Sequence, residues 1–172
     1  MSNSLSRIPV GVLVERRKAT SQWADYLWRP ASVLVGEPDA RPWTVVSQTG
    51  DSAMFYAGRA EIEFHQAETA HYRDNLAAGP SLWVVLRSTG AEPPYELAKV
   101  TADPYEGEAY AEAGAGIVEP VPMPDSVRDF IAAFIAEHHV EQPFVKRARK
   151  RADPEAMARG GPQQHHGDES ER

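Results

Sequence analysis

The side chains best suited to acid–base or metal chemistry gather in one short segment of this 172-residue sequence. They are three glutamates, two histidines and one arginine: Glu61, Glu63, His65, Glu68, His71 and Arg73. Imidazoles exchange protons near neutral pH, and both imidazoles and carboxylates bind metal ions. A pocket lined by all six would hold the convergent polar groups that are typical of ligand sites. This segment is therefore our candidate polar pocket.

The spacing of the two histidines argues against a helical metal site. A helix zinc motif places its histidines four residues apart on one face, whereas His65 and His71 are six apart. Glu68 is one helical turn from each, yet the two imidazoles then point to different sides. A polar strand-to-helix junction, capped or hydrogen-bonded by His65 and Glu68, explains these residues more simply. We predict no metal site.

Motifs for other chemistries are missing from the sequence. There is no Walker-type phosphate loop and no dinucleotide-binding glycine fingerprint after a strand, and no nucleophile elbow. Cysteine is absent, which excludes disulfides, thiolate nucleophiles and cysteine-bound metal clusters within the chain. We therefore expect no cofactor and no catalytic residue, and we favour a protein that is not an enzyme.

A basic run near the C-terminus stands out against an acidic chain of net charge −7. Residues 142–172 carry seven Lys/Arg and five Asp/Glu, whereas the first 141 residues carry eleven and twenty. Such an acidic body repels nucleic-acid phosphates and anionic lipids, so only the tail could recruit them. We predict that one aromatic and five basic residues of this run bind a partner: Phe144, Lys146, Arg147, Arg149, Lys150 and Arg151. Docking on an acidic protein, phosphate binding and a purely solvated tether are the alternatives for this run.

Large aromatic residues crowd the first quarter of the chain. Trp23, Tyr26, Trp28 and Trp43 could form a recognition surface, because tryptophan and tyrosine are enriched at binding hot spots. In a small domain rich in strands such residues more often fill the core or cover its edge. We expect them in the core.

Apolar periodicity predicts the elements that must position these groups. Period-two alternation indicates strands over 7–16 and over 53–66, with Gly58 at a bulge of the second one. A β-branched run predicts a strand near 27–35, and the segment "WTVVS" predicts a short strand over 43–47. Short β-rich runs add strands over 81–88 and 95–101.

Helical spacing and capping residues predict three helices, the first of them before the strand over 81–88. The first covers 67–78 and ends before Gly79. The second follows Asp103, which suits an N-cap before Pro104. The third lies within 124–140 and carries an apolar stripe that must pack on the sheet.

Together these elements predict the fold class and the domain organisation. We expect a single α+β domain, with a mainly antiparallel sheet of five to seven strands, two short helices and a longer C-terminal helix packed on it. Residues 1–6 form a flexible N-terminus, 7–143 the globular domain, and 144–172 a basic and then polar disordered tail. The N-terminal segment is a poor signal peptide, and no window reaches the roughly 18 to 20 apolar residues of a membrane span. We expect a cytoplasmic protein without membrane contact.

Several uncommon segments occur in a fixed order, among them "IPVGVLVERR", "WADYLWRPASVLVG", "FHQAETAHYRDNL" and "VTADPYEGEAY". They resemble an uncharacterised proteobacterial domain-of-unknown-function family, whose genes commonly sit beside genes of formate dehydrogenase and other molybdenum enzymes. The resemblance covers nearly all of residues 7–151. It implies a cytoplasmic accessory protein that works near a formate dehydrogenase, in its maturation or cofactor loading. Some members are labelled molybdopterin-guanine dinucleotide biosynthesis proteins, but this sequence lacks the glycine-rich loop followed by lysine that the label implies.

Three functions follow as hypotheses. The leading one is a non-enzymatic accessory or assembly factor for a molybdenum-dependent formate dehydrogenase, whose partners are proteins of that enzyme or of the molybdenum-cofactor pathway. The alternative is an enzyme of molybdenum-cofactor biosynthesis that uses the candidate polar pocket. A further alternative, which the acidic body disfavours, is nucleic-acid binding through the basic tail.

Overall fold

The computed structural model describes residues 5–36 and 38–139 of the chain. These residues form one α+β unit, which confirms the predicted fold class. Its strands are β1 (Leu5–Lys18), β2 (Tyr26–Val35), β3 (Thr44–Thr49), β4 (Ser52–His65), β5 (Ser81–Ser88), β6 (Tyr95–Thr101) and β7 (Ile117–Pro122). Its helices are α1 (Thr69–Ala78), α2 (Pro104–Glu112) and α3 (Asp125–His138), with a 3-10 turn, η1 (Gln66–Glu68), before α1.

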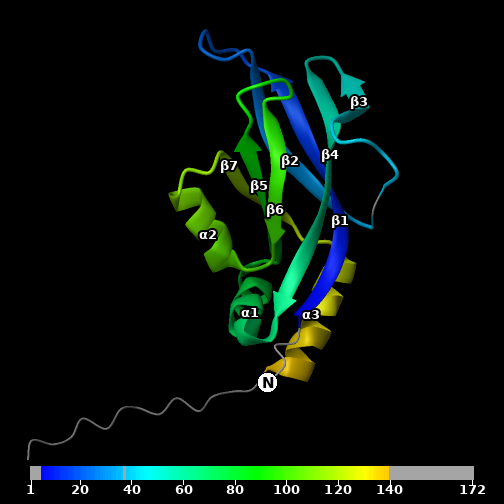
Figure 1. Cartoon of the computed structure of the whole chain (residues 1–172), viewed down its shortest axis with the longest axis vertical. Helices are drawn as coiled ribbons and strands as arrows, with labels where there is room; N and C mark the ends of the chain where they lie inside the picture. Colours follow the sequence, from blue (N-terminus) through cyan, green and yellow to red (C-terminus); the bar gives the residue numbers. More distant parts are fainter. Residues whose placement is uncertain (1–4, 37, 140–172) are drawn as a thin grey trace, which may run out of the picture. The chain divides into compact units, whose positions relative to one another are not determined.

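The strands pair in two antiparallel sheets. The larger has the order β2-β1-β4-β3 and the smaller the order β6-β5-β7. Strand β4 lies against β6, and β2 lies against β7, so the two sheets enclose a common core (Figure 1). Alternation predicts which residues of a strand face the core but not which strands are neighbours, so the division into two sheets was not predictable.

Strand β1 lies inside the larger sheet, between β2 and β4. It begins at Leu5, two residues before the predicted start of the domain, because it pairs with β4 from Leu5 opposite His65 to Arg17 opposite Ser52. The pairing shifts where Val12 lies opposite Gly58 and Leu13 opposite Tyr56, which leaves one extra residue on β4. Gly58 has a positive φ of 134° at this point. The bulge predicted at Gly58 is therefore confirmed.

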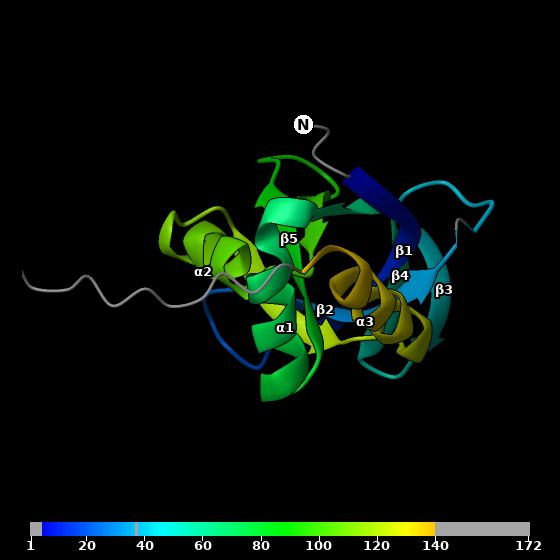
Figure 2. The same cartoon turned by 90° about the horizontal axis from the view of Figure 1, so that it is seen from below.

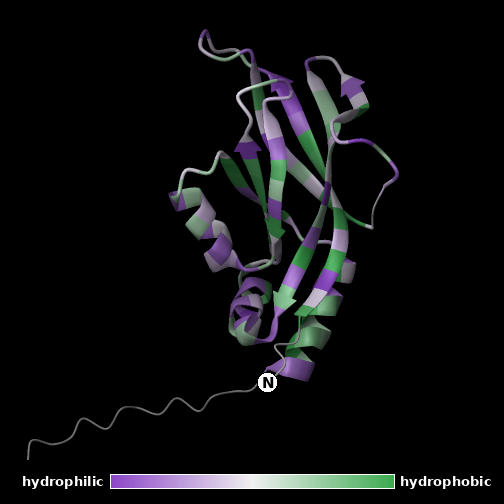
Figure 3. Ribbon diagram, in the orientation of Figure 1, coloured by the Kyte–Doolittle hydropathy of each residue, from purple (hydrophilic) through white to green (hydrophobic). Residues whose placement is uncertain are grey.

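The core is closed at one end by helices. Ile131 and Phe134 of α3 are buried, and the rings of Phe130 and Phe134 pack against Phe64 of β4. The predicted apolar stripe of the last helix is confirmed. Seen from below, α1 and α3 lie next to each other across this end of the sheets (Figure 2). Hydrophobic residues concentrate on β5 and along α3, whereas α1 is mostly hydrophilic (Figure 3).

None of the helices formed by the described residues has the length and apolar character needed to cross a membrane.

Candidate functional site

Asp103 occupies the junction between strand β6 and helix α2. Its Oδ1 accepts hydrogen bonds from the backbone N–H groups of Tyr105 (2.9 Å) and Glu106 (3.4 Å), which confirms the predicted N-cap. Its own backbone N–H donates to Thr101 Oγ1 at 3.1 Å. The side chain is only 6% exposed. These bonds fix the carboxylate and leave its second oxygen, Oδ2, available to helix α1.

A buried asparagine holds α1 beside this junction. The amide of Asn75 donates to the carbonyl oxygens of Ser81 and Ala102, both at 2.8 Å, and its Oδ1 accepts from the Ser81 N–H at 3.0 Å. Because Ala102 immediately precedes Asp103, these bonds set the distance between α1 and the start of α2. One turn earlier on the helix than Asn75 is His71, which therefore meets Asp103.

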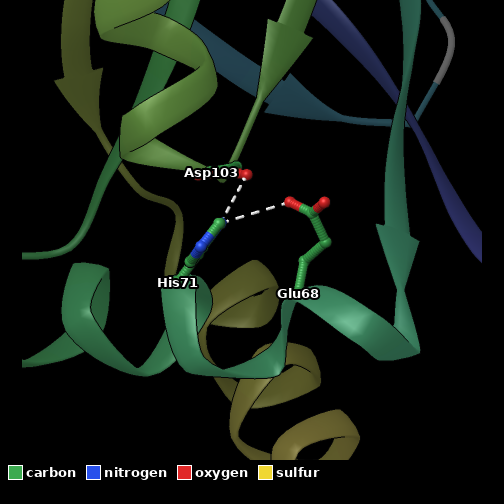
Figure 4. A group of neighbouring side chains, drawn as sticks. All are labelled: Glu68, His71 and Asp103. Atoms are coloured by element: carbon green, nitrogen blue, oxygen red, sulfur yellow. Dashed lines mark hydrogen bonds and ion pairs between the residues drawn. The ribbon is translucent and has the colours of Figure 1, made fainter.

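Two carboxylates converge on the imidazole of His71 (Figure 4). Its Nδ1 lies 2.9 Å from Asp103 Oδ2 and 3.2 Å from Glu68 Oε2. Glu68 is the last residue of η1 and precedes α1, so it reaches His71 across one turn. The ring of Tyr105 packs on the imidazole, with 4.5 Å between centroids. We call Glu68, His71 and Asp103 the polar cluster.

The three groups of the polar cluster shift one another's proton affinity. The hydrogen bond with Asp103 raises the pKa of Glu68, and burial adds to this effect. The hydrogen bond with Asp103 also raises the pKa of His71, against the opposing effect of burial. Burial acts to raise the pKa of Asp103, but hydrogen bonds to Glu68 and His71 outweigh it and lower that pKa. Asp103 therefore holds its negative charge more readily than an ordinary aspartate, because its pKa is lowered.

The six residues of the candidate polar pocket divide into three contact groups. Glu61, Glu63 and His65 alternate along β4, where Arg7 Nε lies 3.8 Å from Glu61 and 3.6 Å from Glu63. His65 Nε2 lies 3.6 Å from Glu63. Their neighbours on β4, Ile62 and Phe64, are fully buried, so these polar residues lie on the outer face of the strand.

The other three residues of that candidate pocket lie on or next to α1. Glu68 and His71 join Asp103, which is 32 positions after His71. Arg73 donates from Nη1 to His139 Nε2 at 3.1 Å. A guanidinium only donates, so His139 carries its proton on Nδ1, which lies 2.9 Å from Thr69 Oγ1. Neither Asp103 nor His139 could be joined to this group from the sequence, since both come from distant elements.

A second region of interest is the turn between β1 and β2 together with the first residues of β2. Trp23 is 93% exposed, Leu27 60% and Tyr26 44%. We call these three residues the hairpin surface. Figure 1 places this turn, in blue, at the end of the sheets away from α1 and α3. The expectation of core aromatics holds for Trp28 and Trp43, which pack against the core. It is wrong for Trp23, which lies in the turn, and for Tyr26, the first residue of β2, because both lie at the far end of the hairpin and are exposed.

Basic side chains border the hairpin surface. The guanidinium of Arg16 lies over the ring of Tyr26, 4.3 Å from its centroid. Arg17 and Arg29 have exposed side chains that pair with Glu15 at 3.3 and 3.7 Å. In the sequence, residues 1–60 carry seven Lys/Arg and five Asp/Glu, whereas residues 61–139 carry four and fourteen. The hairpin surface therefore belongs to the basic part of the domain, and the polar cluster belongs to the acidic part.

Strand β3 adds an apolar edge to the larger sheet. It pairs with β4 on one side and is exposed along its whole length. Val45 and Val46 are 53% and 56% exposed, and the strand, TVVSQT, has no charged residue. An uncharged edge strand offers free backbone groups and apolar side chains to another chain.

The predicted partner-binding residues lie outside the described residues. They are Phe144, Lys146, Arg147, Arg149, Lys150 and Arg151, within the predicted tail 144–172. The docking role of the basic run therefore stays a prediction.

Residues 9–148 match a protein family whose description is "Protein of unknown function (DUF3305)". No curated protein and no solved structure matches the chain. The matched range includes both the polar cluster and the hairpin surface.

Proposed function

Because the chain belongs to the DUF3305 family, whose description assigns no activity, we propose its function from its own surface. The protein is a non-enzymatic accessory or assembly factor that acts by protein–protein contact. The observation that carries this proposal is the hairpin surface, where Trp23 is 93% exposed in the turn and Tyr26 and Leu27 are exposed at the start of β2. Large apolar side chains that stay exposed at one end of a domain are typical of a protein-binding surface.

The free energy of binding gained when a partner covers Trp23 is large. Burial of a tryptophan at the centre of an interface contributes about 2 to 4 kcal/mol to binding. The surrounding cations define the partner further, since Arg16, Arg17 and Arg29 attract acidic groups at the rim of the contact. The surface of a partner that matches the hairpin surface is an apolar pocket with an acidic border. The uncharged edge of β3 supports the same reading, because a partner strand can pair with it.

The partner that we propose is a subunit or maturation factor of a molybdenum-dependent formate dehydrogenase. The sequence resemblance supports this choice, since it covers nearly all of residues 7–151 and implies work near that enzyme. An acidic protein fits the charge around the hairpin surface, whereas the fourteen acidic residues within 61–139 disfavour a nucleic acid along the domain.

The alternative of a cofactor-biosynthesis enzyme required one pocket lined by Glu61, Glu63, His65, Glu68, His71 and Arg73. These residues lie instead in three separate contact groups, so the geometry favours the accessory role. Calorimetry of the full chain with GTP discriminates the two, because the biosynthetic enzyme requires nucleotide binding and the accessory factor does not.

Co-purification from native cells tests the accessory role. The tagged full chain is compared with a Trp23→Ala, Leu27→Ala variant and with the control Leu34→Ala, which removes an exposed leucine (40%) from the other end of β2. We expect wild type and control to recover a formate dehydrogenase subunit or maturation factor, and the double variant to lose it. Recovery of none of these proteins, with an unchanged dehydrogenase level in a deletion strain, would overturn the proposal.

A further inference from the structure

The polar cluster brings three metal-ligand atoms from two separate parts of the chain to one point. His71 Nδ1, Asp103 Oδ2 and Glu68 Oε2 all lie within 4.8 Å of one another. The two separations that involve Nδ1 are 2.9 and 3.2 Å. One ligand comes from the end of η1, one from α1 and one from the start of α2. The three ligands are therefore not neighbours within one acidic segment of the sequence.

The two separations that involve His71 Nδ1 match the distances between ligands of a single ion. Imidazole nitrogen and carboxylate oxygen bind Zn²⁺ at about 2.0 to 2.2 Å, so adjacent ligands at angles of 90° to 110° lie roughly 2.9 to 3.5 Å apart. The observed 2.9 and 3.2 Å fall in that range. An ion can therefore take the place of the proton between His71 Nδ1 and Asp103 Oδ2 at the observed separations.

The burial of the three ligands differs in the way that an open metal site requires. Asp103 is 6% exposed, whereas the side chains of His71 and Glu68 are 40% and 37% exposed. One ligand thus anchors the site from inside, and the other two leave a side open to water. Three protein ligands with an open position are typical of zinc sites that keep a solvent ligand.

Asp103, the buried ligand, is also oriented by a second set of contacts. Asp103 Oδ1 is occupied by the backbone N–H groups of Tyr105 and Glu106, so Oδ2 is held towards His71. Hydrogen bonds that orient a ligating carboxylate are a regular part of metal sites. Nearby acidic side chains add to the attraction, since Asp74 accepts a hydrogen bond from the Tyr105 hydroxyl at 2.8 Å.

We propose that Glu68, His71 and Asp103 bind one divalent first-row transition-metal ion, through Oε2, Nδ1 and Oδ2 respectively. One nitrogen and two oxygen ligands favour Zn²⁺ over Mn²⁺, and both over Mg²⁺. The sequence predicted no metal site because it compared His65 with His71. The structure supplies Asp103 as the third ligand, and His65 takes no part. The site does not depend on the proposed protein partner, and its ion links the start of α1 to the start of α2.

The test is titration of the full chain with Zn²⁺, by calorimetry after removal of bound metal with a chelator. The cluster variants are Glu68→Gln, His71→Gln and Asp103→Asn, of which the last retains helix capping because asparagine also caps. The controls are Glu61→Gln and His65→Gln, which alter the outer face of β4 alone. All variants keep His138, His139, His165 and His166, so a loss seen only in the cluster variants reports the cluster.

We expect each cluster variant to lose at least about 10-fold in Zn²⁺ affinity at one site, and both controls to bind as wild type does. Nitrogen NMR of the imidazoles gives a readout that a structural role would not move, because Zn²⁺ must shift Nδ1 of His71 more than Nε2. Equal Zn²⁺ binding by wild type and cluster variants, or an unchanged His71 Nδ1 resonance, would overturn the proposal. Circular dichroism of each variant establishes that it is folded.

Discussion

The polar cluster and the hairpin surface lie at different ends of the same domain and differ in how their side chains are satisfied. In the polar cluster, Asp103 and His71 contact each other and their neighbours, and the carboxylate is buried. In the hairpin surface, the side chain of Trp23 is almost wholly in water. An internally satisfied polar group stabilises the fold or holds an ion, whereas an uncovered apolar group gains free energy when a partner covers it.

Charge strengthens this contrast. The hairpin surface lies in the part of the chain with more Lys/Arg than Asp/Glu, and the polar cluster lies in the part with fourteen acidic and four basic residues. The two regions are therefore proposed to bind different ligands: an acidic protein at the hairpin and a cation at the cluster. Variants that affect one region and spare the other test this division.

The largest effect is expected at the hairpin. Trp23→Ala should weaken partner binding by about 2 to 4 kcal/mol, since it removes the exposed anchor. The free energy of unfolding should change by less than about 0.5 kcal/mol, because Trp23 is 93% exposed. Binding assays and urea unfolding measure the two quantities. A large loss of stability would show that Trp23 supports the fold and would break the contrast.

The next effect lies beside the cluster, at Tyr72. Its side chain is 1% exposed, its hydroxyl accepts from the His65 N–H at 2.9 Å, and burial raises its pKa to about 12 from 10.0. A raised folded-state pKa gives stability that is complete below pH 10 and lost as pH rises towards 12. The loss amounts to roughly 2 to 3 kcal/mol. Unfolding followed from pH 9 to 12 should show this loss in wild type but not in Tyr72→Phe, and an identical pH dependence in both would contradict the assignment.

A third effect concerns the cap itself. Asp103→Ala removes the bonds to the N–H groups of Tyr105 and Glu106 and the partner of His71, and we expect a loss of about 1 to 3 kcal/mol in stability. Asp103→Asn should lose less, since the amide oxygen still caps the helix. Thermal unfolding ranks the variants, and partner binding should be unaffected by either. An alanine variant as stable as wild type would mean that the cap does not hold α2.

The smallest effect is expected at Glu68. Its side chain is 37% exposed, so Glu68→Gln should change the metal-free stability by less than about 1 kcal/mol. Zn²⁺ at a hundred times its dissociation constant should raise wild-type stability by about 2.7 kcal/mol and raise the variant's by much less. Thermal unfolding with and without Zn²⁺ measures both. Equal Zn²⁺ stabilisation of the two proteins would mean that the polar cluster does not bind Zn²⁺.

Local patterns predicted much of the fold. Alternation in β1 and β4, the stripe of α3 and the cap at Asp103 each depend on residues close in sequence, and the structure confirms them. The pairing of strands into two sheets depends on contacts between distant segments, which alternation does not encode.

The candidate sites show the same limit. Glu68 and His71 were found because they are three residues apart, but Asp103 joins them only through the packing of α1 against the β6–α2 junction. The exposure of Trp23 had a local indication, since polar residues surround it in "TSQWAD". That indication was outweighed by the general preference of aromatic residues for the core.

The most direct measurement of the central claim is the affinity of the purified full chain for purified formate dehydrogenase and its maturation factors, with wild type and Trp23→Ala side by side. The account predicts saturable binding of one of these proteins by wild type, weakened at least about 30-fold in the variant, with equal unfolding temperatures. Equal affinities for wild type and variant, or no binding by wild type, would contradict it.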